Sequence, residues 1–123
     1  MLWPVVMILH ELGHAAAGIA VGRPPVWARA GLVPGVVLTP PPVERWARIL
    51  VSGAGPVVEA TAGLLLIVAS PVTGGLQFLT DPWAMVGGVC LLNGAANLLP
   101  WPKSSDGGKL WRAVWDMAVA RRR

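Results

Sequence analysis

Three long apolar stretches constrain the fold of this chain more than any other feature of its sequence. They run from Leu2 to Gly22, from Ile49 to Ser70, and from Trp83 to Leu99 with room to extend to Trp101. A helix of about 20 mainly apolar residues can cross the roughly 30 Å hydrocarbon core of a bilayer. Glycine and alanine are frequent in all three stretches, and small residues let membrane helices pack closely. The sequence therefore predicts an all-α membrane protein with three transmembrane helices in a single domain, residues 1–123.

The composition excludes several other classes of protein. Only 13% of the 123 residues are charged, about half the share of a typical soluble domain, so charged side chains are too few to cover a water-facing surface. The high share of hydrophobic residues excludes intrinsic disorder. The single cysteine, Cys90, excludes an intramolecular disulfide and a zinc site built from cysteines. We do not expect the first stretch to be a secretory signal peptide, because no basic residue precedes it and His10, Glu11 and His14 interrupt it.

The positions of the basic residues predict how the chain is oriented in the membrane. All ten Lys and Arg residues lie in residues 23–48 and 103–123, and none lies in the connection 71–82 or before His10. Basic residues concentrate on the cytoplasmic side of membrane proteins. We therefore expect a multi-pass protein with its N-terminus outside and its C-terminus in the cytoplasm. We also expect the membrane to be that of a bacterial or archaeal cell. The same clustering argues against nucleic-acid binding, which would need one continuous basic face.

Two segments outside the apolar stretches have patterns of their own. The runs Val26–Gly31 and Gly35–Thr39 favour strands, and the prolines at 40–42 end the second run. The connection after the first span is therefore either a small β-hairpin-like loop or an irregular linker. From about 107 to 121, apolar residues recur at helical spacing, which predicts an interfacial amphipathic helix on the cytoplasmic side. The alternative is that this segment begins a fourth span.

The motif His10-Glu11-Leu12-Gly13-His14 lies inside the first apolar stretch. Residues four apart share one face of a helix, so His10 and His14 can present ring nitrogens to one zinc ion. Glu11 can then take a proton from the water that the zinc activates. Ionisable residues inside a membrane span are costly and are functional by default, so a chance pair of histidines explains the motif poorly. The sequence therefore predicts a zinc site with Glu11 as the catalytic base.

A catalytic zinc site needs a third protein ligand and leaves one position for water. The acids outside the motif are Glu44, Glu59, Asp81, Asp106 and Asp116. The predicted topology puts Asp81 on the outer side and places Glu44 and Asp116 in cytoplasmic segments away from the spans. Two candidates remain, namely Glu59 about halfway along the second span and Asp106 just beyond the inner end of the third.

These motifs resemble those of the site-2 protease family of intramembrane zinc metalloproteases. The run HELGHAAAG is similar to the zinc motif of that family, and the segment from Asn97 to Gly108 is similar to its second hallmark, an N-x-x-P stretch that leads to Asp-Gly. Gly55-Pro56 matches a weaker third signature. The resemblance covers nearly the whole chain. It implies a core of three helices with a zinc site near the cytoplasmic side, in which Asp106 is the third ligand.

Two features depart from the family pattern. The spacing from Asn97 to Asp106 is one residue longer than is common, and Glu59 stands where the family usually has asparagine. Glu59 can be a protonated helix-packing residue, a group that positions the substrate, or the zinc ligand in place of Asp106. Asn93 and Asn97 lie one turn apart on the third span and can join helices by hydrogen bonds. The resemblance implies instead that Asn97 holds an extended substrate strand or orients the site.

The predicted function is that of a zinc endopeptidase that hydrolyses peptide bonds within transmembrane segments of other membrane proteins, as in regulated intramembrane proteolysis. Its zinc ligands would be His10, His14 and Asp106, and its base would be Glu11. The alternative is a non-catalytic membrane protein that keeps zinc for structure or binding. A site closed by four protein ligands would favour the alternative, whereas a position open to water favours an enzyme.

Overall fold

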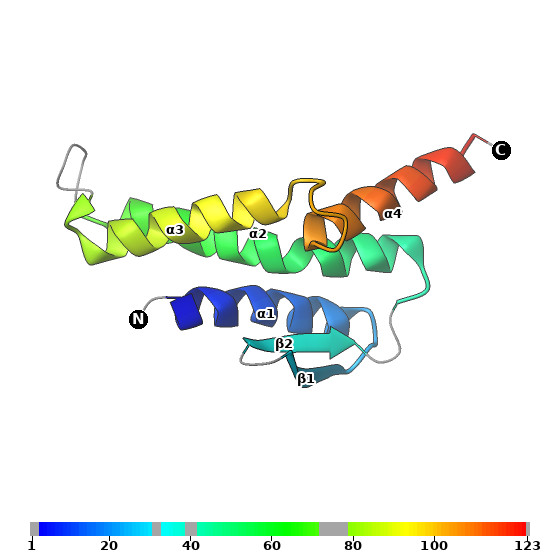
Figure 1. Cartoon of the computed structure of the whole chain (residues 1–123), viewed down its shortest axis with the longest axis horizontal. Helices are drawn as coiled ribbons and strands as arrows, with labels where there is room; N and C mark the ends of the chain where they lie inside the picture. Colours follow the sequence, from blue (N-terminus) through cyan, green and yellow to red (C-terminus); the bar gives the residue numbers. More distant parts are fainter. Residues whose placement is uncertain (1–2, 31–32, 39–41, 72–78, 123) are drawn as a thin grey trace.

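The structure is a computed structural model that describes residues 3–30, 33–38, 42–71 and 79–122. Within these residues the chain forms four helices and two strands (Figure 1). In chain order they are α1 (Trp3–Ala20), β1 (Pro25–Ala30), β2 (Val33–Leu38), α2 (Arg45–Ala69), α3 (Pro82–Asn97) and α4 (Asp106–Ala120). The fold is mostly helical, as the apolar stretches predict.

The helix α2 lies at the centre of the fold, and α1, α3 and α4 each pack against it. In Figure 1, α3 runs beside the second half of α2, α1 lies along its other side, and α4 starts near its middle. Glycine allows this close packing. A Cβ atom on Gly63 would lie 2.5 Å from the carbonyl oxygen of Gly87, and one on Gly13 would lie 2.6 Å from that of Ala54. At both places the two helix backbones therefore approach each other closely.

The helices differ in length from the predicted spans. In the part of the chain that the structure describes, α2 is the one helix that is both long and apolar enough to cross a membrane. It has 25 residues and begins at Arg45, ahead of the predicted start at Ile49. The apolar helix α1 has 18 residues, and α3 has 16 and ends at Asn97. The predicted extension of the third span to Trp101 is therefore not helical.

The strands β1 and β2 pair in a two-stranded antiparallel sheet, in which Ala28 lies opposite Gly35. They lie close to the two runs that the sequence predicts as strands. The connecting residues 31–32 and the prolines at 40 and 41 fall outside the described residues. The sheet lies beside the C-terminal part of α1 (Figure 1), so β2 passes next to the helix that carries the H-E-x-x-H motif.

The segment between α3 and α4 turns the chain so that the start of α4 faces α1. Ser105 caps α4, because its Oγ accepts a hydrogen bond from the N–H of Gly108 at 3.1 Å. The Nε1–H of Trp111 donates to the carbonyl oxygen of Leu98 at 2.9 Å and ties α4 to the end of α3. Gly107 permits the tight approach, since a Cβ atom there would lie 2.6 Å from the Asn97 carbonyl oxygen. Asp106 thereby lies in the first turn of α4 beside α1.

Candidate metal centre

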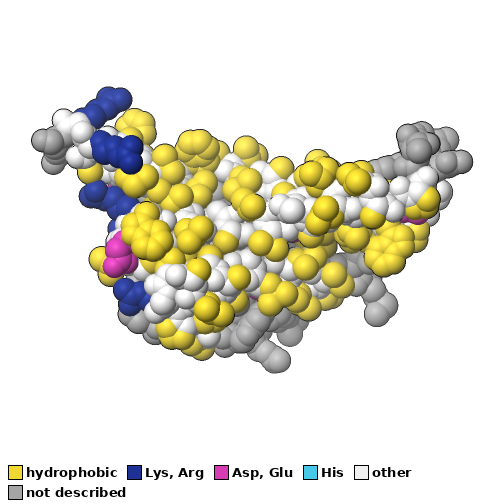
Figure 2. All heavy atoms as spheres, turned by 180° about the vertical axis from the view of Figure 1, so that it is seen from behind, with side chains coloured by type: hydrophobic (Ala, Val, Ile, Leu, Met, Phe, Trp, Pro, Cys, Tyr) yellow, Lys and Arg dark blue, Asp and Glu magenta, His cyan; other side chains and the backbone are white. Residues whose placement is uncertain are grey.

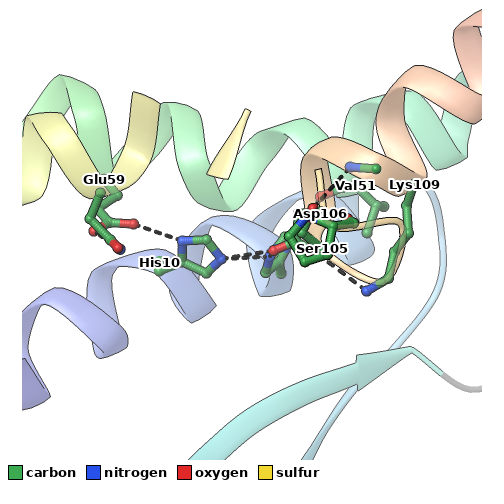
Figure 3. A network of polar contacts seen from close by, with 10 residues as sticks. His10, Val51, Glu59, Ser105, Asp106 and Lys109 are labelled. Atoms are coloured by element: carbon green, nitrogen blue, oxygen red, sulfur yellow. Dashed lines mark hydrogen bonds and ion pairs between the residues drawn. The ribbon is translucent and has the colours of Figure 1, made fainter. Parts of the chain in front are cut away.

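Three side chains from α1 and α4 bring their ligand atoms together at one point. Figure 3 shows two of them, His10 and Asp106, facing each other. Oδ2 of Asp106 lies 3.0 Å from Nε2 of His10 and 3.2 Å from Nε2 of His14. The two Nε2 atoms lie 3.1 Å from each other. Within the described ranges, these three residues form the group of His, Cys, Asp or Glu side chains that could hold a metal ion. We call them the triad.

The ligand atoms of the triad lie close enough together to hold a metal ion, in a geometry near that of a zinc site. Zinc bonds of about 2.0–2.2 Å to nitrogen and oxygen place two ligands of a tetrahedral site about 3.3–3.6 Å apart. The observed separations of 3.0, 3.1 and 3.2 Å are slightly shorter, so small side-chain rotations would open the triad enough for an ion. Two imidazoles and one carboxylate are also a donor set that zinc accepts. The residues present are therefore suited to hold this metal.

Each histidine of the triad is oriented by a partner on the other side of its ring. Nδ1 of His10 lies 2.8 Å from Oε2 of Glu59, and Nδ1 of His14 lies 2.7 Å from the carbonyl oxygen of Val51. An Nδ1–H that donates to such an acceptor leaves the Nε2 lone pair for a metal. Gly55 makes room for the second ring, because a Cβ atom there would lie 2.5 Å from Nε2 of His14. The helix α2 thus orients both rings.

The Asp106 carboxyl is held in its ionised form by its neighbours. In the absence of a metal, burial raises the pKa of this carboxyl, but hydrogen bonds from His10 and His14, whose Nε2 atoms then carry a proton, together lower it by more, so the pKa lies well below its usual range. A metal ion would take the place of these protons. Nζ of Lys109, a largely exposed side chain, lies 3.4 Å from Oδ1 and adds a favourable positive charge. Asp106 is therefore a carboxylate at neutral pH, which is the form that binds a metal ion.

Glu11 lies on α1 directly after the first histidine of the triad and is half-buried. Its carboxylate extends toward β2, because Oε2 lies 3.8 Å from the position that a Cβ atom would take on Gly35. Successive residues of a helix point about 100° apart, so Glu11 flanks the triad and does not belong to it. The strand β2 thus passes beside the predicted base.

The structure brings His10, His14 and Asp106 together and places Glu59 against the ring of His10. Glu59 lies behind the His10 ring, on the edge opposite the triad, and is not one of the converging ligands. Asn97 lies in the last turn of α3. Across the described residues, no hydrogen bond joins its side chain to the triad.

Three contacts of the site complete this arrangement. Nδ2 of Asn93 donates to Oε1 of Glu59 at 2.6 Å, which is the interhelical hydrogen bond that the sequence allowed for this residue. The Val51 carbonyl was not predicted, because a backbone acceptor leaves no signal in the side-chain sequence. Lys109 was also missed, although its position three residues after Asp106 on a helix was a usable signal.

Comparisons of the chain with known protein families, with curated proteins and with solved structures find no match. The interpretation of the site therefore depends on its own geometry and chemistry. Its main features are the donor set of the triad and the burial of both histidines. Glu11 follows His10 directly in the chain and extends its carboxylate toward β2.

Proposed function

We propose that this protein is an intramembrane zinc endopeptidase, similar in its site to the site-2 protease family. The observation that carries the proposal is the convergence of His10, His14 and Asp106, whose ligand atoms lie 3.0, 3.1 and 3.2 Å apart. Catalytic zinc sites use three protein ligands, whereas structural sites are closed by four. The group found in the described part of the chain has three members. The proposed substrates are transmembrane segments of other membrane proteins.

The proposed reaction is the hydrolysis of a peptide bond by water. A zinc ion in the triad would lower the pKa of water towards about 7 and polarise the scissile carbonyl. Glu11 is the general base: its carboxylate takes a proton from the attacking water and then delivers it to the nitrogen of the leaving amine. Asp106 is the most exposed member of the triad, so the proposed route for water runs along its carboxylate.

The strand β2 is the proposed docking element for the substrate. An extended peptide can add to a sheet edge through main-chain hydrogen bonds. Because Gly35 of β2 lies beside the Glu11 carboxylate, a segment that pairs with β2 would pass close to the base. A transmembrane helix must unwind locally to bind in this way, since its peptide groups are otherwise engaged in the helix.

The proposed topology has α1, α2 and α3 crossing the membrane and α4 lying on its cytoplasmic surface. Figure 2 shows a face dominated by hydrophobic side chains, with Lys and Arg gathered at one end of the molecule. Only 28% of the apolar window of α2 is buried, whereas the core helix of a soluble protein is mostly buried. With 18 and 16 residues, α1 and α3 are about 27 and 24 Å long. Local thinning of the bilayer accommodates such lengths.

Cysteine labelling tests this topology. In a Cys90→Ala background, we expect Leu79→Cys to react with a membrane-impermeant thiol reagent in intact cells and Ser104→Cys to react only after lysis. Both positions are exposed. In the proposed topology, Ser104 lies on the side that holds all the basic residues. The reverse pattern of labelling would contradict the proposed orientation.

Cleavage of a synthetic single-span peptide by the purified protein in detergent tests the proposed function. We expect the wild-type protein to contain stoichiometric zinc and to cut the peptide within its apolar segment, as located by mass spectrometry. Removal of zinc with a chelator should abolish cleavage, and addition of zinc should restore it. A protein that binds zinc but cuts no such peptide would instead support a structural or binding role for the metal.

A further inference from the structure

Glu59 is a fully buried carboxyl group inside α2, with an exposed fraction of 0%. Burial of such a group is costly unless its oxygens find partners. Both oxygens have one: Oε2 lies 2.8 Å from Nδ1 of His10 on α1, and Oε1 accepts a hydrogen bond from Nδ2 of Asn93 on α3 at 2.6 Å. Glu59 therefore links the three helices right behind the triad (Figure 3).

The contact with Glu59 determines which nitrogen of His10 is available to a metal. Nε2 of His10 faces Asp106 and His14, so a metal in the triad needs the lone pair of this atom. The ring proton must then sit on Nδ1, where the Glu59 carboxylate accepts it. With the proton fixed there, the ring can neither flip nor change tautomer without loss of this hydrogen bond.

The two histidines of the triad have different partners. His14 donates to a peptide carbonyl, that of Val51, whereas His10 donates to a carboxylate. A carboxylate partner fixes the ring and raises its basicity as a ligand. His10 should therefore be the stronger of the two imidazole ligands, and its strength should depend on one side chain that can be replaced.

We infer that Glu59 is the positioning residue of His10 and that Asn93 holds Glu59 in place. The inference rests on the proposed zinc site. Asn93 engages the Glu59 oxygen that does not contact the ring, so the other oxygen stays directed at Nδ1. In this way α3 supports the zinc site although it carries none of the three ligands of the triad.

Zinc affinity of the purified full chain, measured by chelator competition, tests this role. Glu59→Gln keeps an acceptor for Nδ1–H but loses the charge, and we expect it to weaken zinc binding by about 10-fold. Glu59→Leu leaves the Nδ1–H without an acceptor, and we expect a loss of about 100-fold. Asn93→Leu should weaken binding less than Glu59→Leu does. Thr61→Val, at an exposed position of the same helix, is the matched control and should leave the affinity unchanged.

Two further measurements separate positioning from a merely structural role. The visible absorption spectrum of the cobalt-loaded protein should shift in Glu59→Gln, because the basicity of one imidazole ligand changes. The thermal stability of the metal-free variants reports packing alone. The inference would be overturned if both Glu59 variants were less stable but kept the zinc affinity and the cobalt spectrum of the wild-type protein. If Glu59→Leu does not fold, the same measurements on Glu59→Gln alone decide the test.

These outcomes are distinguishable from failure of the proposed function. A wild-type protein whose zinc affinity depends on Glu59, but which cuts no peptide, would contradict proteolysis and still support the positioning role. A wild-type protein that binds no zinc would overturn both.

Discussion

Asp106→Asn should lose most of its bound zinc. Replacement of a residue that only supports a zinc ligand costs up to about 100-fold in zinc affinity, and we expect the loss of this ligand to cost more. Oδ2 of Asp106 lies 3.0 and 3.2 Å from the two Nε2 atoms, and a neutral amide is a poor zinc ligand compared with a carboxylate. The substitution also removes the only anion of the triad. Metal analysis after a chelator wash, together with competition titration, measures the loss.

The matched control for this substitution is Asp116→Asn, which removes a carboxylate from an exposed position of the same helix. It should keep full zinc. Glu59→Gln should also keep stoichiometric zinc, with the weaker affinity expected for a positioning residue. If Asp106→Asn retained zinc while Glu59→Gln lost it, the ligand set proposed here would be wrong.

Glu11→Gln should reduce peptide cleavage by about 10²–10⁴-fold, the usual contribution of a general acid–base residue, and leave bound zinc nearly unchanged. The reason is that Glu11 flanks the triad and directs its carboxylate toward β2, so its loss removes the proton acceptor without removing a ligand. Initial rates of peptide cleavage and zinc content, measured on the same preparation, test both halves of the prediction.

His10→Ala is the comparison that separates the roles of neighbouring residues, since it should lose both zinc and activity. Glu44→Gln, at an exposed position just before α2, is the control for removal of a carboxylate and should change neither. A loss of zinc in Glu11→Gln as large as that in His10→Ala would contradict the assignment of Glu11 as a base.

The sequence alone was sufficient for the features that depend on near neighbours in the chain. The apolar stretches predicted α1, α2 and α3, and the amphipathic pattern predicted a helix close to the observed α4 (Asp106–Ala120). The spacing of His10 and His14 placed both on one face of α1, because residues four apart on a helix lie one above the other. The predicted ends of the helices were less accurate, because the apolar pattern does not mark where α2 begins or where α3 ends.

The long-range contacts of the site could not be derived from local pattern. From the residues alone, Glu59 and Asp106 were the two candidates for the third ligand, and a family resemblance favoured Asp106. The structure separates them by position: Asp106, 96 residues from His10 in the chain, lies on the Nε2 side of the His10 ring, and Glu59 lies on its Nδ1 side. The pattern of apolar and polar residues along the chain does not show which side of the His10 ring each acid faces.

The sequence by itself therefore determined the helical class of the fold and the motif that supplies two of the three candidate ligands, because both follow from side chains within a few residues of each other. The tertiary structure decided which acid faces the histidines, which atoms orient their rings, and that Asn93 and Glu59 join α3 to the site. These contacts depend on how closely the helix backbones approach at glycines such as Gly13 and Gly55. That distance is set by the packing of whole helices against each other, and no segment of the chain specifies it alone.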